Sequence, residues 1–328
     1  MSMSIQFCPK YFQPGDDSHS LCATRCTTAT CPSSPSGKPV ILCHGLGSNR
    51  NTYLLPAQRS IVHMLLECGC DVWLAELRGH GLSKTGIDWG CPWDVNDYIT
   101  DACAIANFVS CQASGRPVHW IGHSLGGIVG IAMASLPEPP PLASVIAVAS
   151  SFFYSDSGWA RLSFLVPVIT SLKFLPADVL MRGQAPLSFR FVSTITDSFM
   201  AWRSNVDPVV GRQLLATNFE PISKRVTLQL ETAMSPAGLI HRDGVPFTTG
   251  LCNCSVPIFM MAGDRDKQCP SPSVRRLFDL LPQNASNKYQ CFGTSDGCVD
   301  HYGHFDLLIG LRVEEEVFPS IRAFLQAL

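Results

Sequence analysis

A serine, two aspartates and two histidines occur in this chain in settings that suit nucleophilic catalysis. Gly122-His123-Ser124-Leu125-Gly126 matches the pattern G-x-S-x-G, in which the glycines leave room for a sharp turn that lifts the serine hydroxyl out of a sheet. Such a hydroxyl becomes a useful nucleophile only when a base removes its proton and an acid orients that base. Gly263-Asp264-Arg265-Asp266 and His301-Tyr302-Gly303-His304 supply candidates for both roles further along the chain.

The segments before these residues have the pattern of strands that end at a common site. An apolar run at 118–121 leads directly into the serine motif, and small residues follow it in a helical pattern. A second apolar run, at 257–262, ends at the two aspartates. Because active sites of open α/β sheets lie beyond the carboxyl ends of the strands, we expect the serine and the acid to meet there. Taken alone, a Gly-Asp turn or a loop histidine is more often structural; together, in the order Ser, Asp, His, they indicate catalysis.

The oxyanion of a tetrahedral intermediate needs two fixed N–H donors. Leu125, directly after the serine, supplies one backbone N–H. The loop after the first long strand, Cys43-His44-Gly45-Leu46-Gly47, is the expected source of the other, and we assign it to Leu46. His44 fits a structural hydrogen-bonding role in that turn better than the role of base, because His304 follows the acid in chain order.

Short apolar runs alternate with helical patterns along much of the chain. We expect strands at 38–43, 71–77, 118–121, 145–149, 257–262 and 288–292, and helices at 52–68, 95–114, after 124, 274–281 and 313–328. Such βαβ units predict an α/β fold with a mostly parallel sheet flanked by helices.

This alternation lapses between residues 152 and 250. We therefore expect an N-terminal extension with short strands (1–37), a first part of the α/β core (38–151), a mainly helical cap (152–250) and a second part of the core (251–328). The cap is rich in aromatic residues, which either form its own core or line an apolar substrate channel. Phe152, Phe153 and Trp159 are the candidates for contact with substrate.

Composition excludes several classes of function. Lys and Arg number 24 against 26 Asp and Glu, so no cationic field favours nucleic acid as a partner. No apolar run reaches the roughly 20 residues that span a bilayer, and residues 1–11 lack a secretory signal, so we expect a cytoplasmic protein. The fifteen cysteines are scattered without zinc-site spacing, and neither a metal nor an organic cofactor is expected. Charged residues make up only 15%, which fits loose membrane contact or a buried cap core equally well.

These motifs resemble the α/β-hydrolase superfamily. The resemblance is carried by the late Asp and His and by His44-Gly45, Leu77-Arg78-Gly79-His80-Gly81-Leu82-Ser83 and Gly122-His123-Ser124-Leu125-Gly126-Gly127. Two further segments, Asp71-Val72-Trp73 and His304-Phe305-Asp306-Leu307-Leu308-Ile309-Gly310, are similar to the lipase and acid-lipase-like branch. The resemblance implies a cap inserted between strands 6 and 7, and it favours His304 over His301 as base and Asp266 over Asp264 as acid.

The implied activity is that of a serine carboxyl-ester hydrolase. Ser124 would attack an apolar acyl ester, His304 would move the proton, and water would release the acyl-enzyme. An acyltransferase or a thioesterase with the same triad is the alternative. A ligand-binding protein that kept the fold without the reaction is a third class, although such proteins generally lack a triad member.

Overall fold

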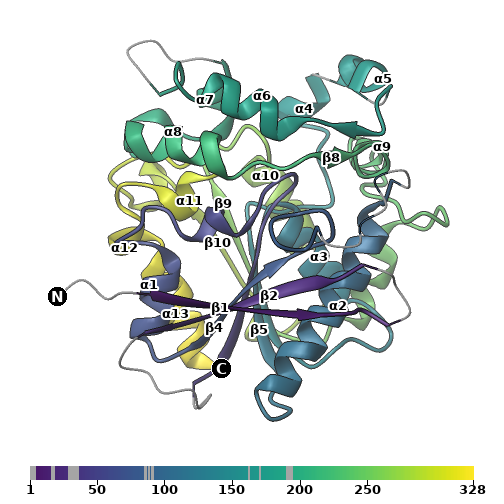
Figure 1. The fold of residues 1–328 in the computed structure, drawn as a ribbon, viewed down its shortest axis with the longest axis vertical. Coiled ribbons are helices and arrows are strands. Elements are labelled where there is room, and N and C mark those ends of the chain that lie inside the picture. Colours follow the sequence, from purple (N-terminus) through teal and green to yellow (C-terminus); the bar gives the residue numbers. More distant parts are fainter. Residues whose placement is uncertain are drawn as a thin grey trace.

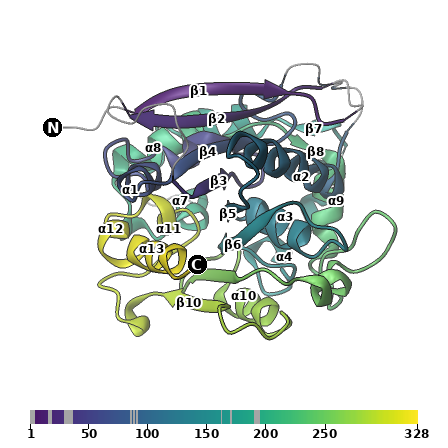
Figure 2. The same cartoon turned by 90° about the horizontal axis from the view of Figure 1, so that it is seen from below.

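The computed structural model describes residues 5–15, 19–28, 37–84, 87, 89, 92–161, 163–169, 171–189 and 195–328. They contain a sheet of eight strands (Figures 1 and 2). Across the sheet the order is β1 (Ile5–Phe12), β2 (Leu21–Thr28), β4 (Asp71–Glu76), β3 (Pro39–Cys43), β5 (Val118–His123), β6 (Leu142–Val148), β9 (Ile258–Gly263) and β10 (Lys288–Phe292). From β4 to β10 all neighbours are parallel, whereas β1 pairs with β2 and β2 with β4 in antiparallel fashion. The expected α/β fold with a mostly parallel sheet is confirmed.

Both faces of the central part of this sheet, from β4 to β9, are buried under helices. Along β3, Ile41 and Cys43 belong to one apolar layer, while Val40 and Leu42 belong to the other. Figure 2 shows α1 (Ile61–Glu67) and α13 (Phe318–Ala327) on one side of the sheet and α2 (Val95–Gln112) and α3 (Leu125–Ala134) on the other. Burial on both faces is the reason that the strands read in the sequence as continuous apolar runs.

Two of the expected helices are interrupted, and proline lies at both interruptions. The segment expected as one helix at 52–68 forms η1 (Arg50–Tyr53) and α1, separated by a loop that contains Pro56. The segment expected at 313–328 forms α12 (Val313–Glu316) and α13, with Pro319 in the first turn of α13. Proline lacks the N–H that a helix interior needs and disfavours helical backbone at the residue before it. Further helices are α10 (Ser271–Phe278), η5 (Thr294–Asp296) and α11 (Asp306–Ile309).

Between β6 and β9 the chain leaves the sheet and forms short helices. These are α4 (Gly158–Arg161), η2 (Ser163–Leu165), α5 (Val166–Ile169), α6 (Ala177–Gln184), α7 (Ile195–Met200), η3 (Arg203–Asn205), α8 (Pro208–Thr217), α9 (Lys224–Thr232) and η4 (Phe247–Asn253), with a two-stranded sheet of β7 (Phe174–Leu175) and β8 (Ile222–Ser223). Figure 1 shows α5 to α8 as a layer at the top of the molecule. We keep the name cap for residues 152–250; the exact domain boundaries stay a prediction.

In the part of the chain that the structure describes, none of the helices combines the length and the apolar character that crossing a bilayer requires.

Candidate active site

Ser124 lies in the sharp turn between β5 and α3. Its backbone has a φ of 53° and a ψ of −117°, a strained conformation for a residue with a side chain. Hydrogen bonds to the backbone N–H and to the backbone carbonyl of Ser124 hold the turn. The Ser124 N–H donates to the Val148 carbonyl at the end of β6 (2.8 Å), and the Ser124 carbonyl accepts from Gly127 N (3.0 Å) and Ser150 Oγ (2.8 Å).

The two motif glycines make this turn sterically feasible. A Cβ at Gly122 would lie 2.1 Å from the Gly126 carbonyl oxygen, and a Cβ at Gly126 would lie 2.2 Å from the Cys43 carbonyl oxygen. Both obstacles are backbone atoms, which cannot rotate away as a side chain can. The close approach of α3 to β5 and to the end of β3 therefore depends on glycine at both positions.

The expected base and acid contact each other in the interior. His304 Nδ1 lies 2.8 Å from Asp266 Oδ2, and both side chains are buried. The other carboxylate oxygen, Asp266 Oδ1, accepts from the backbone N–H groups of Gln268 (2.8 Å) and Cys269 (2.9 Å). Because the acid is fixed by these donors, it holds the proton of His304 on Nδ1 and leaves Nε2 as the basic nitrogen.

His123 brings the loop of His304 next to the nucleophile turn. His123 Nε2 donates to the His304 carbonyl (3.1 Å), and the centroids of the two rings lie 4.7 Å apart. Burial, reinforced by the neighbouring His304 ring, lowers the pKa of His123 well below its ordinary value. Ser124 Oγ itself makes no hydrogen bond within the described part of the chain, so the structure does not contain a Ser124–His304 bond. Catalytic hydrogen bonds often tighten only when substrate binds.

The two expected oxyanion donors flank Ser124. Leu125 begins α3, so its N–H has no partner within the helix. The turn that carries Leu46 packs directly against the nucleophile, because a Cβ at Gly45 would lie 3.1 Å from Ser124 Cβ. Within the described residues neither N–H has an acceptor. Both are thus available to a developing negative charge.

His44 has the character of a structural residue. Burial lowers the pKa of His44 to about 3, so the ring stays neutral. Its Nδ1 donates to the Gly45 carbonyl (2.9 Å), and its Nε2 accepts from the N–H of Leu77 (3.2 Å). The ring therefore ties the turn of Leu46 to the end of the neighbouring β4.

The acid and histidine that were not assigned to the triad form a separate pair. His301 Nδ1 lies 2.5 Å from Asp264 Oδ2, and the N–H of Tyr302 donates to Asp264 Oδ1 (3.0 Å). This pair is more exposed than Asp266 and His304. The structure thus joins each acid to one histidine, Asp264 to His301 and Asp266 to His304, and the catalytic roles of Asp266 and His304 stay a prediction.

Comparison with known proteins identifies the family. Residues 38–210, slightly more than half of the chain, match the family model described as the alpha/beta hydrolase fold. The chain belongs to the α/β-hydrolase family. It is also similar to "Lipase 3" of Drosophila melanogaster, with 30% identity over 89% of this chain and 83% of that protein. "Triacylglycerol lipase 1" of Arabidopsis thaliana is 23% identical, over 90% of this chain and 81% of that protein.

The solved structures agree on the fold of this α/β-hydrolase. A thermophilic esterase from Thermogutta terrifontis superposes with a TM-score of 0.61 over 98% of both chains, at 18% identity. A monoacylglycerol lipase from Paleococcus ferrophilus gives the same TM-score over 89% of this chain and 96% of that one, also at 18% identity. The lipase-like character expected from the motifs is confirmed by the sequence relatives.

Tyr53 is a supporting residue of this hydrolase that the sequence did not reveal. Its hydroxyl donates to the Cys43 carbonyl (2.6 Å) and accepts from the N–H of His123 (2.9 Å), so it joins the strand before the oxyanion turn to the strand before Ser124. Burial raises the pKa of Tyr53 well above its ordinary value, which keeps the phenol protonated. In the sequence Tyr53 lies within the segment expected as a helix at 52–68, and no local signal sets it apart.

The three aromatic residues expected to contact substrate have different environments. Phe152 is buried and packs edge-to-face on Phe247, with ring centroids 5.5 Å apart. Phe153 is buried too, and the Arg276 guanidinium lies over its ring at 3.7 Å. Trp159 is 36% exposed on the cap. Two of the three therefore contribute to the protein core, and contact with substrate stays a prediction for all three.

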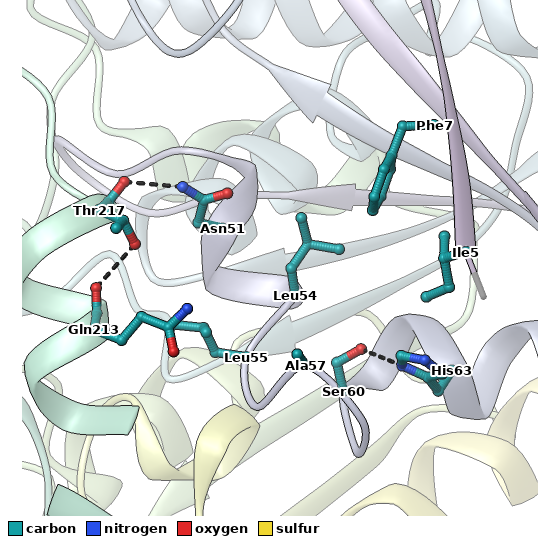
Figure 3. Close-up of a pocket in the computed structure, with 10 residues that line it drawn as sticks. All are labelled: Ile5, Phe7, Asn51, Leu54, Leu55, Ala57, Ser60, His63, Gln213 and Thr217. Atoms are coloured by element: carbon teal, nitrogen blue, oxygen red, sulfur yellow. Dashed lines mark hydrogen bonds between the residues drawn. The ribbon is translucent and has the colours of Figure 1, made fainter. Parts of the chain in front are cut away.

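A cavity of about 410 Å³ lies between β1, α1, α8 and the loop around η1 (Figure 3). Its lining mixes apolar with amide, hydroxyl and imidazole side chains: Ile5, Phe7, Asn51, Leu54, Leu55, Ala57, Ser60, His63, Gln213 and Thr217. None of the expected triad or oxyanion residues lines it. This cavity is therefore separate from the site of the expected chemistry.

The described residues also contain no cluster of three or more His, Cys, Asp or Glu side chains suited to a metal ion.

Proposed function

We propose that this hydrolase cleaves carboxyl esters of apolar acyl chains through an acyl-enzyme on Ser124. The observation that carries the proposal is the buried Asp266–His304 hydrogen bond beside the strained turn of Ser124. The lipase names of the sequence relatives support ester hydrolysis as the reaction class.

The reaction would proceed in two halves. His304 Nε2 takes the proton of Ser124 Oγ as this oxygen attacks the ester carbonyl, and the N–H groups of Leu46 and Leu125 donate to the oxyanion. Collapse of the tetrahedral intermediate breaks the ester bond, and His304 gives its proton to the departing alcohol. A water molecule then attacks the acyl group while His304 accepts its proton. The second collapse releases the carboxylic acid and returns the proton to Ser124.

The surface of the cap supports an apolar substrate. Many of the exposed large apolar side chains belong to the cap, and they include Trp159, Phe164, Leu172, Val179, Leu180, Leu187 and Val209. Phe164 is 71% exposed and Leu187 is 69% exposed. Exposed apolar side chains gathered on one part of a protein are typical of contact sites for lipids or other apolar partners. We therefore include peripheral contact with a lipid surface in the proposal.

Labelling with a fluorophosphonate tests the nucleophile. The wild type should be labelled on Ser124, and Ser124→Ala should be neither labelled nor active on p-nitrophenyl esters. Ser135→Ala is the matched control, because Ser135 follows the other end of α3 and its hydroxyl donates to the Ile131 carbonyl (2.8 Å). If Ser124→Ala is labelled as the wild type is, the proposed nucleophile is wrong.

Products and chain length test the rest of the proposal. Free carboxylic acid should form even when alcohol or lysolipid acceptors are present, and rates should rise from acetyl toward decanoyl esters. Transfer to the acceptor as the main product would establish the acyltransferase alternative, and a preference for thioesters over matched esters would establish the thioesterase. A preference for acetyl esters would overturn the apolar channel.

For the compartment, we propose the cytoplasm. The described cysteines are free thiols, and Cys8, Cys68, Cys111 and Cys252 are exposed. Such thiols persist in a reducing compartment, whereas an oxidising one promotes disulfide exchange. Cell fractionation with an antibody against the chain tests this expectation, and recovery in the medium or in the secretory pathway would contradict it.

A further inference from the structure

Asp306 is fully buried two residues after His304, and its carboxyl group joins the His304 loop to the cap. The N–H of Gly303 donates to both carboxyl oxygens at 2.9 Å. From the cap, the N–H of Trp202 donates to Oδ1 (3.3 Å), and Asn205 Nδ2 lies 3.5 Å from Oδ2. One side chain therefore connects a direct neighbour of His304 to two cap residues.

Asn205 makes the reciprocal connection from the cap. Its backbone carbonyl and its Oδ1 both accept from the N–H of Leu311, at 2.8 and 3.2 Å, and its Nδ2 donates to the His301 carbonyl (3.2 Å). Between these anchors the N–H of Phe305 donates to the Met200 carbonyl (3.0 Å). The loop from residue 301 to 311 is thus hydrogen-bonded to the cap before, beside and after His304.

Glycines allow this close approach. A Cβ at Gly303 would lie 2.7 Å from the backbone nitrogen of Trp202, and a Cβ at Gly310 would lie 2.5 Å from the Asp306 carbonyl oxygen and 3.1 Å from Asn205 Nδ2. Three residues that surround His304 in the sequence, Gly303, Asp306 and Gly310, therefore share one structural task. Each packs against, or bonds to, the same few residues of the cap.

The same cap segment also reaches the turn of the acid. Gln268 Nε2 donates to the Phe199 carbonyl (3.0 Å), while the Gln268 N–H donates to Asp266. Nearby, the N–H of Gly158 in the cap donates to the Lys267 carbonyl (2.7 Å). The cap therefore contacts the loops of both the base and the acid.

We infer that the cap segment Phe199–Asn205 positions the catalytic base, and that Asp306 and Asn205 are the positioning residues for His304. This inference rests on the proposed function, because it concerns the same triad. It gives the cap a part in the chemical step in addition to its expected part in substrate choice. A misplacement of a catalytic group by about 1 Å can cost on the order of 100-fold in rate. Loss of these contacts should therefore reduce turnover rather than affinity.

The test compares Asp306→Asn, Asp306→Ala and Asn205→Ala with the wild type at pH 7. The measurements are the rate constant of fluorophosphonate labelling of the folded enzyme, and kcat and KM for butyrate and decanoate p-nitrophenyl esters. We expect labelling and kcat to fall about 100-fold in Asp306→Ala. The fall should be smaller in Asp306→Asn, whose amide oxygen still accepts one N–H. KM should change little, and the loss should be equal for the two esters.

Asp71→Asn is the matched control. Asp71 is a buried acid that accepts from Arg25 Nε (2.6 Å). It begins β4, so it lies at the opposite end of the parallel strands from Ser124, which follows the carboxyl end of β5. This variant should lower the melting temperature and leave the labelling rate of the folded enzyme unchanged. If it slows labelling as much as Asp306→Asn does, the losses reflect general destabilisation and the inference is overturned.

The outcomes separate this inference from the proposed function. A wild type that is not labelled on Ser124 contradicts the proposed function. A labelled wild type, together with Asp306→Ala and Asn205→Ala variants that label at the wild-type rate, contradicts the positioning role alone. A lower melting temperature with unchanged labelling, or a loss confined to KM of the longer ester, contradicts it as well. If Asp306→Ala does not fold, the labelling rate of Asn205→Ala decides.

Discussion

Replacing Gly122 by alanine tests whether the nucleophile turn depends on the absence of a side chain. The added Cβ would lie 2.1 to 2.3 Å from backbone atoms of Gly126 and Gly127, so the first turn of α3 must move by about 1 Å to restore ordinary contact. Overpacking of this kind costs about 1–3 kcal/mol, against a total stability of about 5–15 kcal/mol. We therefore expect a folded variant in which Ser124 is displaced and reacts about 100-fold more slowly.

The assay combines the rate of fluorophosphonate labelling with thermal unfolding followed by circular dichroism. At roughly 2 °C per kcal/mol for a large domain, the melting temperature of Gly122→Ala should fall by only a few degrees. Gly183→Ala is the control, because Gly183 lies inside α6 and its added Cβ would meet no atom within 4 Å. Alanine is favoured over glycine in a helix by up to about 1 kcal/mol, so this variant should be at least as stable as the wild type and equally reactive.

Two results would refute the reasoning. If Gly122→Ala is labelled within about twofold of the wild-type rate and melts at the same temperature, the turn tolerates a Cβ and the steric account is wrong. If the melting temperature falls while the folded fraction is labelled at the wild-type rate, Gly122 serves helix packing alone. In that case the placement of Ser124 does not depend on this glycine.

Three further predictions concern charges inside the protein. Asp266→Asn should lower kcat by about 10⁴-fold, because the amide no longer fixes the His304 tautomer. The unfolding temperature should change little, because the amide oxygen still accepts a backbone N–H. Steady-state kinetics and calorimetry check the two expectations. Burial lowers the pKa of His119 to about 4, so the stability that this neutral ring provides is complete above pH 6.5 and is lost as the pH falls toward 4. His119→Gln should flatten that loss in melts recorded from pH 7 to pH 4, and an unchanged slope would contradict the assignment. Burial raises the pKa of Asp306 to about 8, so its contribution to stability is complete below about pH 4 and is lost as the pH rises through 8. Asp306→Asn should therefore gain stability relative to the wild type between pH 5 and pH 9. A difference in stability that stays constant over this range would show that the N–H donors keep the carboxylate ionised throughout.

The sequence predicts those elements whose local pattern of apolar residues matches their burial in the folded protein. β3 is buried on both faces, so Val40 to Cys43 form a continuous apolar run that identifies a strand without knowledge of its neighbours. The N-terminal hairpin differs in this respect. Short strands were expected there, but the pairing of β2 with β4 joins residues about fifty positions apart, and nothing local specifies that pairing. The broken helix after Arg50 was within reach of the sequence, because Pro56 marks the interruption.

The site shows the same division between local and distant information. Ser124, Gly122 and Gly126 form one local motif, and the apolar run before it and the helical pattern after it are adjacent in the sequence, so the turn could be predicted from local information. The sequence offered two acids and two histidines, and only chain order and resemblance favoured Asp266 with His304. Spatial pairing is a property of two loops that meet, and therefore it appears only in the structure, where the buried pair and the more exposed pair are separate.

The contacts of the cap indicate that different parts of it affect substrate choice and catalysis, which composition did not indicate. Among the described residues, those of α6 make no hydrogen bond to the loops of His304 or Asp266. Changes in α6 should therefore alter chain-length preference through KM. Changes within the segment should alter kcat for all esters alike, because Asn205 and Asp306 act on the base rather than on the acyl chain. Residues of the cap outside Phe199–Asn205 can then change, and alter the choice of substrate, without loss of catalysis. The segment Phe199–Asn205 is constrained by the need to hold His304, whatever ester is bound.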